Sequence, residues 1–190
     1  MATIQKNKIT PNLWFDDRAE EAAKFYASVF KNSKVGRITR YGKEGFEVHK
    51  RPAGSVMTVE FMIEGQSFLA LNGGPVFKFN EAISFIINCK SQQEIDRYWD
   101  ELSEGGDKNA QQCGWLKDKF GVSWQVVPEA LSEMLSSGDT EKSQRVMKTF
   151  LQMKKIDVAT LERAFKKEEL GFQMKRAKAD KGATKKRVKV

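Results

Sequence analysis

Few side chains in this sequence could do chemistry, and most of them suit binding better than bond making. Glu60 lies in a predicted strand and could act as a base if burial raised its pKa; a surface glutamate on an edge strand is the alternative. Cys113 would need to be a thiolate to react, and no histidine lies near it in the sequence, which favours a structural thiol. Trp14, Trp115 and Trp124 could form an aromatic wall for a planar or apolar molecule, with core packing as the alternative for at least one of them.

Histidine and cysteine are too scarce for the usual metal centres or for a disulfide framework. The only histidine, His49, is followed by Lys50 and Arg51 in a predicted loop, where we expect a solvated side chain. The two cysteines, Cys89 and Cys113, lack the paired spacing of a zinc site. We therefore expect free thiols, and a metal cup with two histidines from this chain is excluded.

Charge is distributed unevenly along the 190 residues. The net charge is +8, but residues 166–190 hold ten Lys or Arg and three Asp or Glu, which leaves 23 basic and 22 acidic residues in positions 1–165. The basic character therefore belongs to a C-terminal tail, which could contact nucleic acid weakly or be a solvated extension. No apolar run could span a membrane and the N-terminus is unlike a signal peptide, so we expect a cytoplasmic protein with no membrane contact.

One short pattern occurs twice. Residues 65–71, Gly-Gln-Ser-Phe-Leu-Ala-Leu, return 56 positions later as residues 121–127, Gly-Val-Ser-Trp-Gln-Val-Val. Each segment is typical of a strand leaving a tight turn. Ile87 also lies 72 positions after Phe15, in a similar apolar run. The repetition predicts two copies of one supersecondary unit, with a ligand site where the copies meet.

Hydrophobic periodicity predicts the same order of elements in both halves. Each half should have a helix after its first strand, and the second of these helices should cover residues 92–103. Strands are predicted at residues 9–15, 33–41, 55–63, 66–71, 82–88, 113–117 and 122–127. The expected fold class is α+β, built from duplicated βαβββ modules with repeats at about residues 8–75 and 80–128.

After Pro128 the pattern changes to helices, predicted at residues 128–135, 140–153 and 157–170. Their apolar side chains could dock on the body or on a second subunit. Residues 171–190 lack core residues, and we expect them to be disordered. The expected organisation is a duplicated domain at 1–128, a helical extension at 129–170 and a basic tail at 171–190.

Several motifs are similar to those of one protein family. They are Asn-Leu-Trp-Phe-Asp at 12–16, Ala-Leu-Asn-Gly-Gly-Pro at 70–75, Phe-Lys-Phe-Asn-Glu-Ala at 77–82, and above all Cys-Gly-Trp-Leu-Lys-Asp-Lys-Phe-Gly-Val-Ser-Trp-Gln-Val-Val-Pro at 113–128. On these residues the chain resembles the PhnB-like branch of the vicinal oxygen chelate (VOC) superfamily, the glyoxalase/bleomycin resistance/dioxygenase group. Members of the branch often carry a demethylubiquinone methyltransferase label. The resemblance covers roughly residues 8–155 and leaves out the basic tail.

The resemblance implies a cup between two four-stranded sheets, in which enzymes of the superfamily commonly hold a divalent metal through His and Glu. Carried onto this sequence, the four ligand positions fall near Thr10, Leu69, Ala82 and Gln125. The alternatives on the same strand faces, two residues away, are Asn12, Leu71, Ser84, and Ser123 or Val127. Neither set suits a metal, so we expect a metal-free cup in which Gln125 orients a ligand through hydrogen bonds.

The methyltransferase label has a sequence test of its own. A methyl-donor enzyme of the common α/β kind needs a glycine-rich turn between a strand and a helix. The nearest glycine cluster, Leu-Asn-Gly-Gly-Pro at 71–75, ends in proline and has no predicted helix after it. We interpret the cluster as a turn between the two repeats.

These features predict a homodimer that binds, and could also convert, a small organic molecule in a metal-free cup. The predicted ligand-binding residues are Asn12, Trp14, Glu60, Asn72, Cys113, Trp115 and Gln125, with no metal ligand and no cofactor assigned. Any catalysis would come from Glu60, Asn72 or Cys113. Two alternatives stay open: a metal-dependent lyase or dioxygenase of the same fold, and a nucleic-acid-associated protein that acts through its tail.

Overall fold

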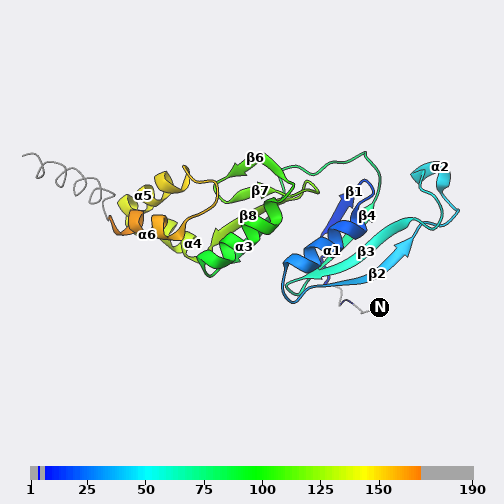
Figure 1. Ribbon diagram of the computed structural model, residues 1–190, viewed down its shortest axis with the longest axis horizontal. Helices are drawn as coiled ribbons and strands as arrows, with labels where there is room; N and C mark the ends of the chain where they lie inside the picture. The colour runs from blue at the N-terminus through cyan, green and yellow to red at the C-terminus, as the bar shows by residue number, and fades with distance from the viewer. Residues whose placement is uncertain (1–3, 5–6, 168–190) are drawn as a thin grey trace, which may run out of the picture.

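The computed structural model describes residue 4 and residues 7–167 and confirms the duplicated βαβββ fold (Figure 1). The first module holds β1 (Asn12–Phe15), α1 (Ala19–Val29), β2 (Lys34–Arg40), α2 (Phe46–His49), β3 (Val56–Ile63) and β4 (Gln66–Asn72). The second holds β5 (Phe85–Cys89), α3 (Gln92–Ser103), β6 (Asp107–Gln112), β7 (Trp115–Lys117) and β8 (Ser123–Pro128). A helical extension follows, with α4 (Glu129–Leu135), α5 (Thr140–Phe150) and α6 (Val158–Lys166). The tail predicted at 171–190 lies outside the described residues.

Both modules have the same sheet topology. The strand orders are β1-β4-β3-β2 and β5-β8-β7-β6, and in each sheet the first strand runs parallel to the last. Figure 1 shows the two sheets side by side along the long axis, with the extension beyond the second. Helices α1 and α3 pack on their own sheets and contact each other at the junction. We call the sheet face under these helices the helix face and the opposite one the open face.

Aromatic side chains join the modules on the helix face. The Trp124 ring centroid lies 5.5 Å from that of Tyr26 in α1 and 5.3 Å from that of Phe30, which directly follows α1. Phe120 approaches Tyr26 at 5.8 Å from the second module. Because aromatic side chains bury large apolar areas and prefer such tilted contacts, this cluster holds the two modules together.

A buried carboxylate lies inside the same junction. Asp118, only 3% exposed, accepts hydrogen bonds from Tyr26 Oη at 2.7 Å and Trp124 Nε1 at 2.8 Å. It also accepts from the backbone N–H groups of Phe120 and Val122, at 2.8 and 3.0 Å. Burial raises the pKa of the Asp118 carboxyl, against the opposing effect of these donors. Asp118 thus links the β7–β8 turn of the second module to α1 of the first.

Strand register corrects one sequence correspondence. Leu13 pairs with Ala70 and Ile87 pairs with Val126. Because residues 70 and 126 are equivalent in the 56-residue repeat, Ile87 corresponds to Leu13, and the predicted match with Phe15 is wrong by two positions.

Two elements were missed by the sequence analysis. The edge strand β6 has the sequence Asp-Lys-Asn-Ala-Gln-Gln, which is polar on both faces and mostly exposed, so no apolar alternation marks it. The short helix α2 lies inside the predicted loop around His49. Strand β5 also begins at Phe85, three residues later than predicted.

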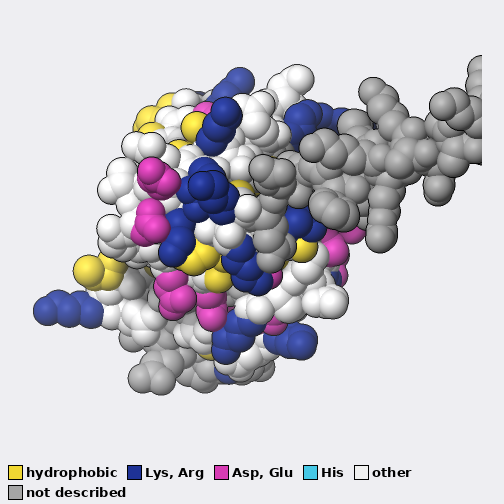
Figure 2. Space-filling model, turned by 90° about the vertical axis from the view of Figure 1, so that its left-hand side faces the viewer, with side chains coloured by type: hydrophobic (Ala, Val, Ile, Leu, Met, Phe, Trp, Pro, Cys, Tyr) yellow, Lys and Arg dark blue, Asp and Glu magenta, His cyan; other side chains and the backbone are white. Residues whose placement is uncertain are grey.

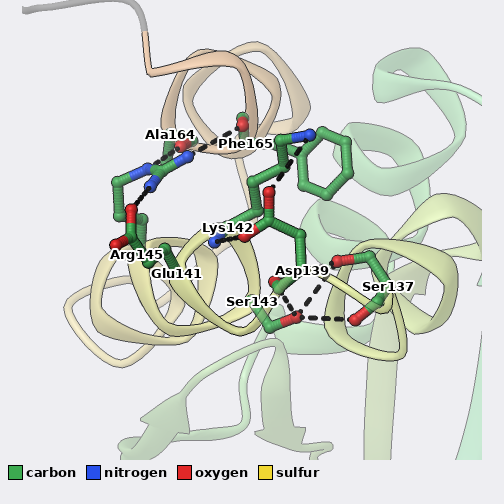
Figure 3. Close-up of polar contacts among 8 residues, drawn as sticks. All are labelled: Ser137, Asp139, Glu141, Lys142, Ser143, Arg145, Ala164 and Phe165. Carbon is green, nitrogen blue, oxygen red and sulfur yellow. Dashed lines mark hydrogen bonds and ion pairs between the residues drawn. The ribbon is translucent and has the colours of Figure 1, made fainter.

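The helical extension continues the second module. Backbone hydrogen bonds from Cys113 N to Met153 O and from Gly114 N to Lys154 O, both 2.8 Å, join the start of β7 to the segment after α5. Figure 3 shows how α5 is fixed: Asp139 Oδ1 accepts from Lys142 N at 3.1 Å, and Arg145 Nε donates to Ala164 O on α6 at 3.0 Å. Figure 2, which faces this end, shows Lys and Arg side chains interspersed with Asp and Glu.

No helix in residues 7–167 is long and apolar enough to cross a bilayer. The cysteines in this range are free thiols, as predicted. Burial raises the pKa of Cys89 to about 12, which keeps that thiol protonated at neutral pH.

Candidate functional site

A cavity of about 460 Å³ lies between the modules at the seam of their open faces. We call it the seam cavity. Its lining comes from β1, the linker at residues 73–84, β5 and the start of β8, and includes Asn12, Trp14, Lys78, Phe79, Phe85 and Ser123. A cavity of this size, with aromatic walls and a few polar groups, is typical of small-molecule sites. It lies between the two repeats, which is where the sequence analysis expects a ligand site.

The linker that forms one wall is held at both ends. Trp14 Nε1 donates a hydrogen bond to Gly74 O at 2.8 Å, and Phe79 packs on Phe15 with ring centroids 5.1 Å apart. At the other end Glu81 forms an ion pair with Lys117 of β7. The linker therefore bridges the two modules and leaves the seam cavity between itself and the sheets.

Gly73 is required by the position of the Trp14 ring. A Cβ at residue 73 would lie 2.2 Å from two ring atoms, far inside van der Waals contact. Glycine thus lets the chain leave β4 directly against the indole that lines the cavity.

Trp115 and Gln125 lie on the open face of the second sheet, on paired strands, as alternation predicts. Gln125 Nε2 donates to Ser84 Oγ at 2.9 Å, next to the linker. Trp124 points the other way, into the junction core, and is 3% exposed. Asn12 and Trp14 line the seam cavity itself, and Gln125 contacts the linker beside it through Ser84.

Glu60 lies on the open face of the first sheet but outside the seam cavity. Its carboxylate pairs with the Arg37 guanidinium at 2.8 Å and lines a smaller hollow of about 130 Å³ with Ile4 and Thr10. The neighbouring strand offers it only the apolar Leu69. Its charge is therefore balanced within the first module.

Asn72 and Cys113 occupy structural positions away from the seam cavity. Asn72 Oδ1 accepts from Ala19 N at 2.8 Å and Nδ2 donates to Val56 O at 3.1 Å, so the amide anchors the start of α1 from the helix face. Cys113 has a backbone φ of 53°, and its Sγ contacts Phe150 O at 3.6 Å, beside the extension. The structure does not bring either side chain to the other predicted ligand-binding residues.

Of the residues that line the seam cavity, the sequence analysis selected only Asn12 and Trp14 as ligand-binding, and Lys78, Phe79 and Ser123 are among those it did not select. Lys78 and Phe79 belong to the linker, and the alternating Phe-Lys-Phe pattern at 77–79 was the available signal. Ser123 was considered only as a metal ligand position. Its side chain is buried, at 2% exposure, and its Oγ has no hydrogen-bond partner.

Strand pairing shows where the metal-ligand positions implied by the superfamily resemblance lie in this structure. Leu69 pairs with Asn12 and Gln125 pairs with Ile86, whereas Ala82 and Ser84 precede β5. The paired positions hold two hydrocarbon side chains, Leu69 and Ile86, and two neutral amides, Asn12 and Gln125. These four side chains are a poor donor set for a divalent metal. Across the part of the chain that the structure describes, no group of three or more His, Cys, Asp or Glu is placed to hold one. The superfamily's metal therefore does not fit these residues.

The paired mixed sheets, each with parallel first and last strands, have the duplicated βαβββ topology that the sequence resemblance to the VOC superfamily implies. A family model described as 3-demethylubiquinone-9 3-methyltransferase matches residues 7–127. The chain belongs to this PhnB-like family. A comparison with curated proteins finds no match.

Several solved structures are similar to this chain. A PhnB protein from Bacillus cereus, named as a 3-demethylubiquinone-9 3-methyltransferase, shares 32% identity over 64% of this chain and 99% of its own, with a TM-score of 0.56. The fosfomycin resistance protein FosX from Listeria monocytogenes shares 12% identity over 73% of this chain and 98% of its own, with a TM-score of 0.40. A glyoxylase/bleomycin resistance protein/dioxygenase domain from Frankia shares 10% identity over 65% and 93%, with a TM-score of 0.41.

Proposed function

We propose that this protein binds a small organic molecule in the seam cavity and does so without a metal ion. The observation that carries the proposal is the cavity itself, about 460 Å³ in volume and lined by both repeats and the linker between them. Trp14, Phe79 and Phe85 supply apolar walls, while Asn12 supplies a neutral hydrogen-bonding group. Binding and orientation are what such a lining does best.

The donor set supports the metal-free part of the proposal. A carboxylate or imidazole is missing from all four superfamily ligand positions, and the nearest open-face carboxylate, Glu60, is already paired with Arg37. A hydrophobic and amide-lined site holds an organic ligand by shape and hydrogen bonds.

Gly73 and Gly74 do not support a binding site for a nucleotide-like methyl donor. Gly73 N donates to Phe15 O at 2.9 Å and Gly74 N to Asp16 O at 3.2 Å, so both N–H groups are used within the fold. Residues 73–84 contain no helix whose N-terminus could hold a phosphate or carboxylate.

Fluorescence titration with N-phenyl-1-naphthylamine, a neutral planar probe, tests the proposal. We expect saturable binding of one probe per chain, weakened at least about tenfold by Asn12→Trp, which places a large side chain at the exposed β1 wall. The control variant Lys31→Trp, which adds the same side chain at an exposed position outside the cavity, should bind within about twofold of the unmodified protein. Absence of saturable binding, or equal binding by both variants, contradicts the proposed site.

Elemental analysis of the purified protein tests the metal-free part separately. We expect less than stoichiometric zinc, iron, manganese, nickel and cobalt. A stoichiometric divalent metal that survives dialysis would overturn that part, whatever the probe does.

We also propose that the protein forms a homodimer through apolar side chains around the seam. Ile86 on the open face and Val76, Phe77 and Ile83 on the linker are each more than half exposed, which is unusual for large apolar residues grouped in one region. A second copy of the chain would remove them from water. Sedimentation equilibrium should show a dimer that Ile86→Lys weakens and Val48→Lys, on exposed α2, leaves intact. A concentration-independent monomer contradicts this proposal.

A further inference from the structure

We infer that the ligand of the seam cavity is a planar organic anion, held by the Lys78 ammonium and by a hydrogen bond from Ser123 Oγ. This inference rests on the proposed function, because it names the chemical class that the same cavity accepts. Two independent observations point to it. The buried Ser123 hydroxyl has no hydrogen-bond partner, and the Lys78 ammonium has no ion pair with any described residue; both residues line the cavity.

The Ser123 hydroxyl is the first observation. Its side chain is 2% exposed and lines the cavity, yet its Oγ makes no hydrogen bond. An unsatisfied buried hydroxyl costs about 1–3 kcal/mol. Because Ser123 lines the cavity, rotation about its Cα–Cβ bond would let the hydroxyl donate to a ligand there. The equivalent residue of the first repeat, Ser67, is also buried but does have an interaction within the protein. The repeated fold therefore allows an interaction at this position, and the lack of a partner is specific to Ser123.

The charge on the cavity lining is the second observation. Lys78 is the only ionisable residue that lines the cavity, and it forms no ion pair with any described residue. Of the neighbouring cations, Lys117 pairs with Glu81 and Arg18 pairs with Glu21 at 2.7 Å, while the Lys119 ammonium lies over the Phe25 ring at 4.2 Å. The lining thus carries a net positive charge that favours an anion.

The walls account for the planar part of the ligand. The rings of Trp14, Phe79 and Phe85 come from three different segments and face the same cavity, which suits a flat unsaturated or aromatic body. Asn12 at the rim can accept or donate one further hydrogen bond. A flat molecule with one carboxylate or sulfonate group satisfies all of these groups together.

The test compares two fluorescent probes with similar rings. The probe 8-anilinonaphthalene-1-sulfonate carries a sulfonate, and N-phenyl-1-naphthylamine lacks it. We expect the anionic probe to bind one per chain, at least about tenfold more tightly at low salt than the neutral one, and to lose most of this advantage at high salt.

Variants assign the contacts. Lys78→Gln should weaken binding of the anionic probe about tenfold and leave the neutral probe unchanged, while Lys78→Arg should retain it. Ser123→Ala should weaken the anionic probe about fivefold without loss of folded stability. Lys31→Gln, an exposed lysine outside the cavity, serves as the control.

The outcomes separate this inference from the proposed function. If the neutral probe binds and Asn12→Trp blocks it, but Lys78→Gln leaves the anionic probe unaffected, the inference is overturned and the binding site stands. If neither probe binds in saturable fashion, both are overturned. Unchanged affinity in Ser123→Ala removes the hydrogen bond from the inference.

Discussion

The two modules share one topology but use equivalent positions differently. In the first, the open-face carboxylate of Glu60 is balanced by Arg37, and the hollow beside it is only about 130 Å³. In the second, the position equivalent to Glu60 holds Trp115, and Ser123 is left without a partner beside the larger cavity. At these equivalent positions the first copy therefore has a balanced carboxylate, whereas the second has an indole and a buried hydroxyl without a hydrogen-bond partner.

The two modules also differ at the end of β3 and at the equivalent position after β7. Register makes Asp118 equivalent to Ile63, and both are buried, at 3% and 7% exposure. The first module fills the position with hydrocarbon, whereas the second fills it with a carboxylate that receives four hydrogen bonds. One of these bonds comes from Tyr26 of the first module, so the polar version also ties the two modules together.

The largest predicted loss of stability comes from removing the Asp118 carboxylate. Asp118→Ala leaves the Trp124 indole N–H and two backbone N–H groups buried without acceptors, and should lower the free energy of unfolding by about 4 kcal/mol. Urea denaturation followed by fluorescence measures it. Glu64→Ala, an exposed residue in the first module's turn, should stay within about 0.5 kcal/mol. A loss below about 1 kcal/mol for Asp118→Ala would show that the junction does not depend on this carboxylate.

The next effect concerns Trp14 and Gly73, which correspond to Asn88 and Glu129 in the second module. Gly73→Ala places a Cβ against the Trp14 ring and should cost about 2 kcal/mol, measured by thermal denaturation. Gly138→Ala is the control, because nothing lies within 4 Å of its added Cβ.

A double variant sharpens this prediction. Trp14→Asn introduces the second module's residue and removes the ring, so Gly73→Ala should be nearly neutral in that background. Equal costs in both backgrounds would mean that the ring is not the reason for glycine.

A smaller effect separates the equivalent serines. Ser67 has an interaction inside the protein, so Ser67→Ala should lower the free energy of unfolding by about 1 kcal/mol. Ser123 Oγ has none, so Ser123→Ala should leave stability unchanged or raise it by up to about 1 kcal/mol. Matching losses in both variants, measured by urea denaturation without ligand, would remove the distinction between the modules.

The smallest effect is a pH dependence from Asp118. Burial raises its pKa in the folded protein, so the folded state holds this proton more tightly than the unfolded state does. Stability from the carboxyl is therefore greatest below its unfolded pKa and declines as pH rises through the folded value. The stability advantage of the unmodified protein over Asp118→Asn should shrink as pH rises from about 4 to 7. An advantage that grows over this range would show that the hydrogen bonds outweigh burial.

Strand alternation and turn glycines were sufficient to predict the fold. They could not predict β6, whose polar sequence carries no alternation. Nor could they predict the burial of Asp118, since an aspartate after a strand is typical of an exposed turn. Within the site, Asn12 and Trp14 followed from the first strand. Lys78 and Ser123 did not, because their surroundings depend on the path of an irregular linker.

That linker has a consequence for how the family can vary. Residues 73–84 form no helix and no sheet ladder, yet they supply part of the wall of the seam cavity. A substitution there changes the shape and charge offered to a ligand while the two sheets keep their hydrogen bonds. The shape and charge of the proposed site can therefore change through the cavity-lining side chains of the linker while the architecture of the two sheets stays the same.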